Sequence, residues 1–236
     1  MSNPNVSQIQ RWQSRIGAWL QRPLDHKIRS AAGKTRKIVY WLEDTIFEKR
    51  HGLDCRGYIE KDQLGNVYPE VLLHSQAYQA ASCATIRNLI LEAKKTGVVF
   101  DHFIDLGSGK GKACFYAARK CSFRKIIGIE FSRDLVEAAD SNMRNFASIF
   151  GAYNIHFVHG DAAAYFLPTG NNLVFLFNPF DEFILSEFLE KNIDRFKESR
   201  SVIAYLNDKH RHCLAKAGFV TLYRNQDTQS SLHQYV

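Results

Sequence analysis

The sequence predicts an α/β fold in which a mostly parallel seven-stranded sheet carries helices on both faces and ends in an antiparallel hairpin. Between residues 80 and 206, short apolar runs alternate with stretches of helical periodicity. The apolar runs are continuous, as in strands that are buried on both faces of a parallel sheet. The last two apolar runs are separated by polar residues with no helical pattern between them, which favours a hairpin.

The first predicted elements lead to a strand-to-helix turn. Helix 80–93 carries apolar residues at helical spacing, and Gly97 closes it. The apolar residues of 98–104 predict the first strand, and a helix over 112–120 follows it. Residues 125–131 predict the second strand.

The remaining elements continue the alternation. Ser132 can cap a helix with an apolar stripe from Leu135 to Phe146, and Asp181 can cap a later one. Further strands are expected over 154–158, 173–177 and 202–206, with a helix over 184–193. The hairpin strands are 219–223 and 232–236, on either side of the polar run 225–231.

Length and composition suit one domain with an appendage. The chain has 236 residues and 45% hydrophobic content, which is ample for a sizeable core. No apolar run approaches the ~18 residues of a membrane span, and residues 1–10 lack the apolar stretch of a secretory signal. Five cysteines without a C-x-x-C pair suit a reducing cytoplasm, so we expect a cytoplasmic protein. We interpret His210, His212 and Cys213 as a polar surface turn and predict no metal site.

The N-terminal part differs in charge from the rest. Between Arg11 and Lys37 there are eight basic residues and one acidic residue, a net charge of +7 that equals that of the whole chain. Trp12, Ile16, Trp19 and Leu20 fall at helical spacing. This helix either packs on the core through its tryptophans or contacts nucleic acid, an anionic membrane surface or an acidic protein. We therefore expect a basic, mainly helical extension over 1–66 and a catalytic domain over 67–236.

The most informative motif is the glycine-rich turn Asp-Leu-Gly-Ser-Gly-Lys-Gly at 105–111, between the first strand and its helix. Glycine tolerates positive φ and lets a ligand lie against the backbone, and the free N–H groups of the new helix face that ligand. A phosphate-binding P-loop is excluded because Ala113 stands where Ser or Thr is required. A dinucleotide fingerprint needs its third glycine one residue later. An ordinary strand-to-helix turn stays an alternative.

A second acidic residue strengthens the ligand interpretation. Glu130 ends the second strand, 25 residues after Asp105, where a carboxylate can hold a ribose diol. Phe131 can then lie against an adenine ring. A solvated strand-end carboxylate and a core aromatic are the alternatives for these two residues.

Further motifs follow the next two strands and carry a family resemblance. The tight glycine spacing after Asp105 resembles the first motif of class I S-adenosylmethionine (SAM) methyltransferases. Gly160-Asp161-Ala162 resembles the segment that binds the adenine edge, and Asn178-Pro179-Phe180 resembles the N-P-P-[FY] motif of amino-group methyltransferases. The latter is one proline short of the full pattern.

Residues 52–207 resemble bacterial class I SAM-dependent methyltransferase domains and, distantly, the non-SET histone-lysine methyltransferases. The other matching pieces are 52–54, 57–60, Tyr68, Tyr78 and 127–130. The family usually has a proline and a small polar residue near the second tyrosine, whereas here the run is Leu73-His74-Ser75-Gln76-Ala77. This departure leaves the roles of Gln76 and Tyr78 undefined.

The resemblance implies a Rossmann-like class I methyltransferase fold with SAM as cofactor and S-adenosylhomocysteine (SAH) as product. The implied cofactor-binding residues are Asp105, Gly107, Ser108, Gly109, Gly111, Glu130, Phe131, Asp161 and Ala162. The implied catalytic residues are Asn178, Pro179 and Phe180.

We interpret the chain as a methyltransferase that prefers a nitrogen acceptor, with a protein lysine as one acceptor. A lysine must first lose its proton, and His156 and His159 are the candidate bases near the third strand. A SAM-binding protein without catalysis and a nucleic-acid methyltransferase guided by residues 11–37 are the alternatives. The acceptor and the oligomeric state are left open.

Overall fold

The computed structural model describes residues 35–64, 73–151, 153–177 and 179–236. The chain divides into two compact units, residues 1–43 and 44–236. The second unit contains the sheet and the motifs. No helix among the described residues is long and apolar enough to cross a membrane.

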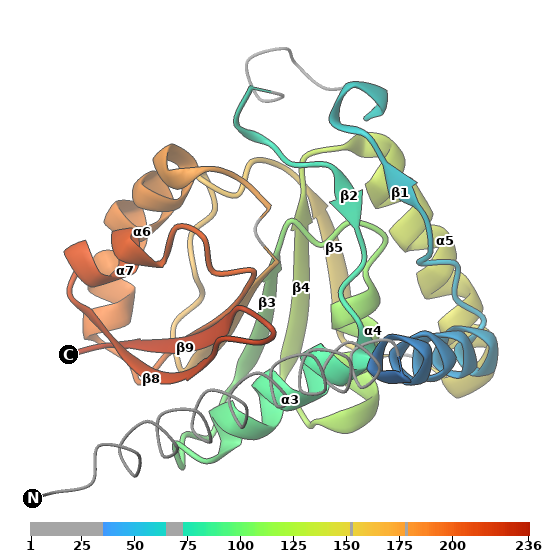
Figure 1. Ribbon diagram of the computed structural model, residues 1–236, viewed down its shortest axis with the longest axis horizontal. Coiled ribbons are helices and arrows are strands. Elements are labelled where there is room, and N and C mark those ends of the chain that lie inside the picture. Colours follow the sequence, from blue (N-terminus) through green and yellow to red (C-terminus); the bar gives the residue numbers. More distant parts are fainter. Residues whose placement is uncertain (1–34, 65–72, 152, 178) are drawn as a thin grey trace, which may run out of the picture. The chain divides into compact units, whose positions relative to one another are not determined.

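A seven-stranded sheet in the order β5-β4-β3-β6-β7-β9-β8 forms the centre of this unit (Figure 1). The parallel strands are β3 (His102–Leu106), β4 (Lys125–Glu130), β5 (Ile155–His159), β6 (Asn172–Phe177) and β7 (Val202–Leu206). The antiparallel pair β8 (Phe219–Asn225) and β9 (Ser230–Tyr235) completes one side, with β9 next to β7. The predicted mostly parallel sheet and its C-terminal hairpin are confirmed.

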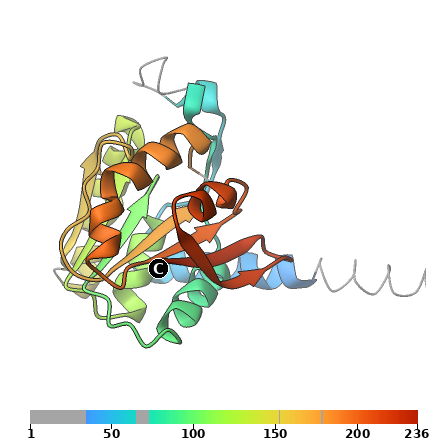
Figure 2. The same cartoon turned by 90° about the vertical axis from the view of Figure 1, so that its left-hand side faces the viewer.

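Helices cover both faces of the sheet, as predicted (Figure 2). Successive strand residues alternate between two core clusters, because side chains point to opposite faces along a strand. Phe103 and Ile126 pack with α3 (Cys83–Lys94), α4 (Lys112–Lys120) and α5 (Arg133–Phe150). Ile104 and Ile127 pack with α6 (Glu182–Lys197) and α7 (Arg211–Lys216).

The two predicted N-cap residues, Ser132 and Asp181, are confirmed. The Ser132 hydroxyl accepts a hydrogen bond from the backbone N–H of Leu135. The Asp181 carboxylate accepts from the N–H groups of Phe183 and Ile184. Both side chains satisfy backbone donors that the first turn of a helix leaves unpaired.

Three details differ from the expectations. The first strand begins at His102, where its pairing with β4 begins, and not at 98. The interpretation of His210 to Cys213 as a surface turn is wrong, because the short helix α7 begins at Arg211 and buries Cys213 and Leu214. The two-stranded antiparallel sheet of β1 (Tyr58–Ile59) and β2 (Tyr78–Gln79) was not predicted from the sequence. The 3-10 helix η1 (Lys61–Gln63) follows β1 in the chain.

Residues 44–64 contribute to the core of the unit. Phe47, Leu53 and Cys55 are buried in the cluster that contains α3 and α4. The division of the chain into an extension over 1–66 and a catalytic domain over 67–236 stays a prediction. The helix expected over Trp12 to Leu20 lies outside the described residues.

We expect the buried imidazole of His233 in β9 to make the fold sensitive to mild acid. Burial lowers the pKa of His233 to about 4, whereas an unfolded histidine has a pKa of about 6.5. The unfolded chain therefore binds the proton more tightly, and stability falls as the pH drops from about 6.5 toward 4. This group should lower the free energy of unfolding by about 2 kcal/mol between pH 7 and pH 5.

Urea unfolding at both pH values measures this loss. His233→Gln should show a smaller drop than the wild type, and the exposed His156→Gln should show the same drop as the wild type. Equal pH dependence in all three proteins would contradict the assignment to His233.

Candidate functional site

The carboxyl ends of four parallel strands bring the predicted motifs to one edge of the sheet. The register places Leu106 of β3 beside Ile129 of β4 and Leu176 of β6, and Glu130 beside His159 of β5. Each motif follows one of these strand ends directly. In open α/β sheets, this edge is where ligands bind.

The glycine turn after β3 has a backbone that requires glycine. Gly107, Gly109 and Gly111 all have positive φ, at 75°, 53° and 88°. An added Cβ at Gly107 would lie 2.3 Å from Cβ of Pro179. An added Cβ at Gly109 would meet the Tyr78 ring. The turn is therefore closed in by side chains from two other segments.

Glu130 fastens this turn to the end of β4. One of its carboxylate oxygens accepts from the backbone N–H of Gly109 at 2.8 Å, and the other accepts from Ser132 N–H at 2.9 Å. Burial raises the pKa of Glu130, and the backbone donors oppose that rise. Glu130 thus holds the loop geometry and also faces the cavity beside it.

Asp105 presents a buried carboxylate at the same edge. Burial, and then the charge of Glu130, raise the pKa of Asp105 to about 8. Its hydrogen-bond partner is the Cys114 thiol at 3.8 Å, and no lysine or arginine among the described residues forms an ion pair with it. The nearby Ser108 hydroxyl is buried and has no hydrogen-bond partner. Ser108 therefore lacks the partner that a buried polar atom normally has, and the donor to Asp105 is a thiol, which is a weak one.

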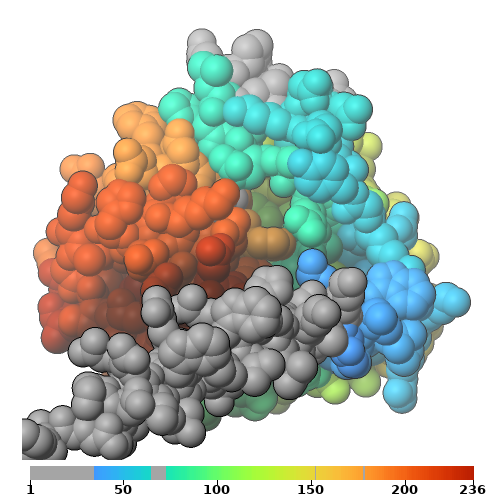
Figure 3. Space-filling view, viewed as in Figure 1, coloured from blue at the N-terminus to red at the C-terminus, as the bar shows by residue number. Residues whose placement is uncertain are grey.

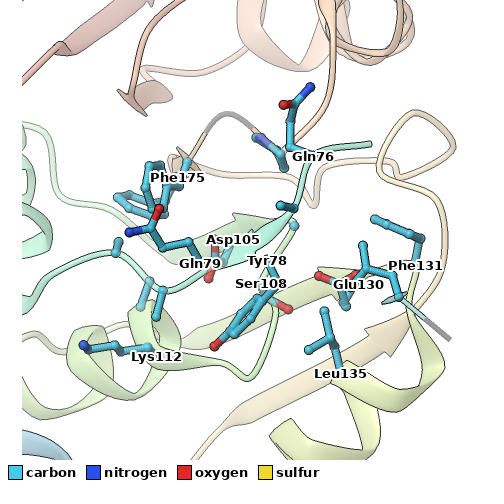
Figure 4. Close-up of a pocket in the computed structure, with 18 residues that line it drawn as sticks. Gln76, Tyr78, Gln79, Asp105, Ser108, Lys112, Glu130, Phe131, Leu135 and Phe175 are labelled. Atoms are coloured by element: carbon cyan, nitrogen blue, oxygen red, sulfur yellow. The ribbon is translucent and has the colours of Figure 1, made fainter. Parts of the chain in front are cut away.

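Two adjoining cavities lie over these residues. The first, of about 60 Å³, is lined by Asp105, Ser108 and Glu130 together with the neighbouring side chains in Figure 4. The second, of about 200 Å³, is lined mainly by apolar groups and reaches Asp161 and Ala162. Gly107, Phe131 and Pro179 line both cavities, so the two cavities adjoin at these residues.

Segment 74–79 lines both cavities of the site. Ser75 forms a β-bridge with Phe180, and the N–H of Gln76 donates to the Pro179 carbonyl at 3.2 Å. The His74 imidazole lies 2.6 Å from the Asp181 carboxylate. In the space-filling view this segment lies beside the chain around β1 (Figure 3).

The Tyr78 ring anchors segment 74–79 over the glycine turn. Its hydroxyl donates to the Cys55 carbonyl at 2.7 Å, and burial raises the pKa of Tyr78. The resemblance left the roles of Gln76 and Tyr78 undefined. The structure places both in the lining of the first cavity.

Lys112 is a residue of the site that the sequence reasoning missed. It is 5% exposed, lines the first cavity, and its ammonium lies 3.1 Å from a carboxylate oxygen of both Asp44 and Glu48. Burial lowers the pKa of Lys112, but the carboxylate of Asp44 and other neighbours raise it more, so the side chain stays charged. Its position at the start of α4, directly after the third glycine, was the available signal.

The predicted site residues fall into three groups. Asp105, Gly107, Ser108, Glu130, Phe131, Asp161, Ala162, Pro179 and Phe180 line the cavities. Gly109 and Gly111 shape the turn beneath the aromatic rings of Tyr78 and of Phe157 and Phe115. Asn178 lies outside the described residues.

The two histidines considered as bases lie elsewhere. His156 and His159 are exposed on the edge strand β5, and neither lines the two cavities. His159 contacts the Phe131 carbonyl, and His156 contacts the Asn154 side chain. His74, which lines the second cavity, is the histidine that the structure brings to the site.

Comparisons with known proteins agree with this arrangement. A family model described as a methyltransferase domain matches residues 100–218. The human methyltransferase 10 domain containing protein is 12% identical with a TM-score of 0.55, over 84% of this chain and 97% of that one, which shows a shared fold.

Other solved structures are more distant. A Synechocystis magnesium protoporphyrin IX methyltransferase with bound SAM is 13% identical with a TM-score of 0.46, over 65% of this chain and 79% of its own. A ribosomal protein L11 methylase from Lactobacillus delbrueckii is 15% identical with a TM-score of 0.45, over 65% and 80%. No curated protein sequence matches the chain.

Proposed function

Because this chain belongs to the methyltransferase domain family, we propose that it transfers a methyl group from SAM to a nitrogen acceptor. It is an enzyme of the SAM-dependent class, with SAH as the product. The observation that supports the proposal is the convergence of Asp105, Glu130 and the Pro179–Phe180 turn on two adjoining cavities at the strand ends.

The polar groups of the first cavity fit the amino-acid tail of SAM. That tail carries an ammonium and a carboxylate, and the Asp105 carboxylate lacks a cationic partner. We assign the ammonium to Asp105. The Ser108 hydroxyl, which has no partner, and the Lys112 ammonium are the donors available to the tail carboxylate. Charge-assisted hydrogen bonds of this kind are the strong ones.

The second cavity suits the adenine ring. Ile129, Phe131 and Ala162 supply apolar walls, and Asp161 at its edge can accept from the exocyclic amine. Glu130 lines the first cavity, and its neighbours in the chain, Ile129 and Phe131, line the second. Each of its oxygens already accepts one backbone N–H, and a carboxylate oxygen has a further lone pair that a ribose hydroxyl can use.

The acceptor side is proposed at the turn after β6. SAM supplies the methyl group as a sulfonium substituent. The chain supplies position: Pro179 lies against Gly107, and Phe180 is held by its bridge to Ser75. Asn178 is proposed to orient the nitrogen lone pair through its side-chain carbonyl, because alignment supplies much of the rate in such transfers. Protein lysine is the acceptor we prefer within the nitrogen class.

Two measurements test this function. Isothermal titration should show SAM and SAH binding and no comparable binding of NADH. Incubating the chain with tritiated SAM and a cell extract, then digesting with protease or nuclease, reports the acceptor class. We expect label that protease releases. Nuclease-sensitive label would favour the nucleic-acid alternative, and binding without labelling of any fraction would favour the non-catalytic one.

A further inference from the structure

Three side chains with metal-ligating atoms converge between α6 and α7. Among the described residues, the ligand atoms of Glu182, His212 and Cys213 all lie within 4.8 Å of one another. Nε2 of His212 is central, 2.8 Å from a Glu182 oxygen and 3.5 Å from the Cys213 sulfur. In Figure 1 the two helices lie next to one another on the side of the sheet away from α5.

These distances are close to those of a tetrahedral zinc site. Zinc binds histidine nitrogen and carboxylate oxygen at about 2.0 Å and thiolate sulfur at about 2.3 Å, which places neighbouring ligand atoms about 3.3–3.6 Å apart. The sulfur-to-nitrogen distance of 3.5 Å already fits. The oxygen-to-nitrogen distance of 2.8 Å must lengthen by a few tenths of an ångström.

Two of the three ligands occupy defined positions in the fold. Cys213 is 6% exposed and packs in the core cluster that contains α6. Glu182 follows the N-cap Asp181, so it lies in the first turn of α6. Glu182 and Cys213 also line a surface groove, which gives an ion a path to the site.

We propose that Glu182, His212 and Cys213 bind a single Zn²⁺ ion, with water in the fourth position. A thiolate, a carboxylate and a neutral imidazole are ligand types that zinc prefers, and the two anionic ligands balance its charge. Binding removes the Cys213 thiol proton, which passes to the buffer. The ion would join the first turn of α6 to α7, and α6 follows the turn that carries Pro179 and Phe180 in the chain.

Cobalt substitution tests the thiolate ligand directly. The full chain, stripped of metal by a chelator and dialysed, is titrated with Co²⁺ alone. A stoichiometric thiolate-to-cobalt charge-transfer band is expected in the wild type and in the Cys121→Ala control, which removes another cysteine that is not fully buried. Cys213→Ser should lose the band. No band in the wild type overturns the proposal.

Zinc affinity tests the two exposed ligands without disturbing the core. Glu182→Gln and His212→Gln should each weaken Zn²⁺ binding about tenfold or more. His210→Gln is the matched control, because its ring centre lies 6.2 Å from that of His212 and it is outside the group. Equal affinity in wild type, Glu182→Gln and His212→Gln would mean that the contact is only a surface ion pair, and the proposal would then be wrong.

Discussion

Replacing Gly107 with alanine is expected to weaken SAH binding by about 100-fold, a loss of about 3 kcal/mol. The φ of 75° disfavours any side chain, and the new Cβ would lie 2.3 Å from Cβ of Pro179. Gly107 lines both cavities, so the methyl group also occupies space that the ligand needs. Isothermal titration of the purified variant with SAH measures the effect.

Gly97→Ala separates the ligand effect from backbone strain. Gly97 has a similar φ of 70°, but its added Cβ meets nothing within 4 Å. This variant should lose about 1–2 kcal/mol of stability from the left-handed backbone alone and should bind SAH like the wild type. If Gly107→Ala binds SAH as well as Gly97→Ala does, the cavity over the glycine turn is not the cofactor site.

Much of the fold could be predicted because its signals are local. The apolar runs that form β4 and β7 are bounded by polar residues. Ser132 and Asp181 indicate helix starts because their side chains cap the first turn. The convergence of Asp105, Glu130 and Asp161 also followed, because parallel strands end at one edge of a sheet.

The parts that were missed depend on contacts between residues far apart in the chain. Lys112 is held in the site by Asp44 and Glu48, more than sixty residues earlier. Ser75 pairs with Phe180, about a hundred residues later in the chain. Such pairings leave no periodicity in the sequence. The short helix α7 was missed because six residues are too few for a helical pattern to be distinguished from a turn.

The raised pKa of Asp105 predicts that cofactor binding releases a proton. Its pKa is about 8 in the free chain, so the carboxyl is mostly protonated at pH 7. A bound ammonium favours the carboxylate and lowers that pKa, so ligand affinity should rise as the pH increases toward 8. At still higher pH the amino group of the ligand itself loses its charge, and its carboxylate neighbour places that loss above the pKa of Asp105. Affinity for SAH should therefore pass through a maximum on the alkaline side of pH 8.

Titration of SAH at pH 7 in buffers of different ionisation enthalpy should show release of up to about one proton, because the group is then largely protonated. Asp105→Asn should abolish this release and weaken SAH binding by 2 kcal/mol or more, about 30-fold.

Methylthioadenosine, which lacks the amino-acid tail of SAH, is the control ligand. It should bind wild type and Asp105→Asn equally and release no proton, because it carries no ammonium for the carboxylate to meet. If Asp105→Asn weakens both ligands by the same factor, then Asp105 acts only by holding the glycine turn. The ammonium must in that case be bound by another group in the first cavity.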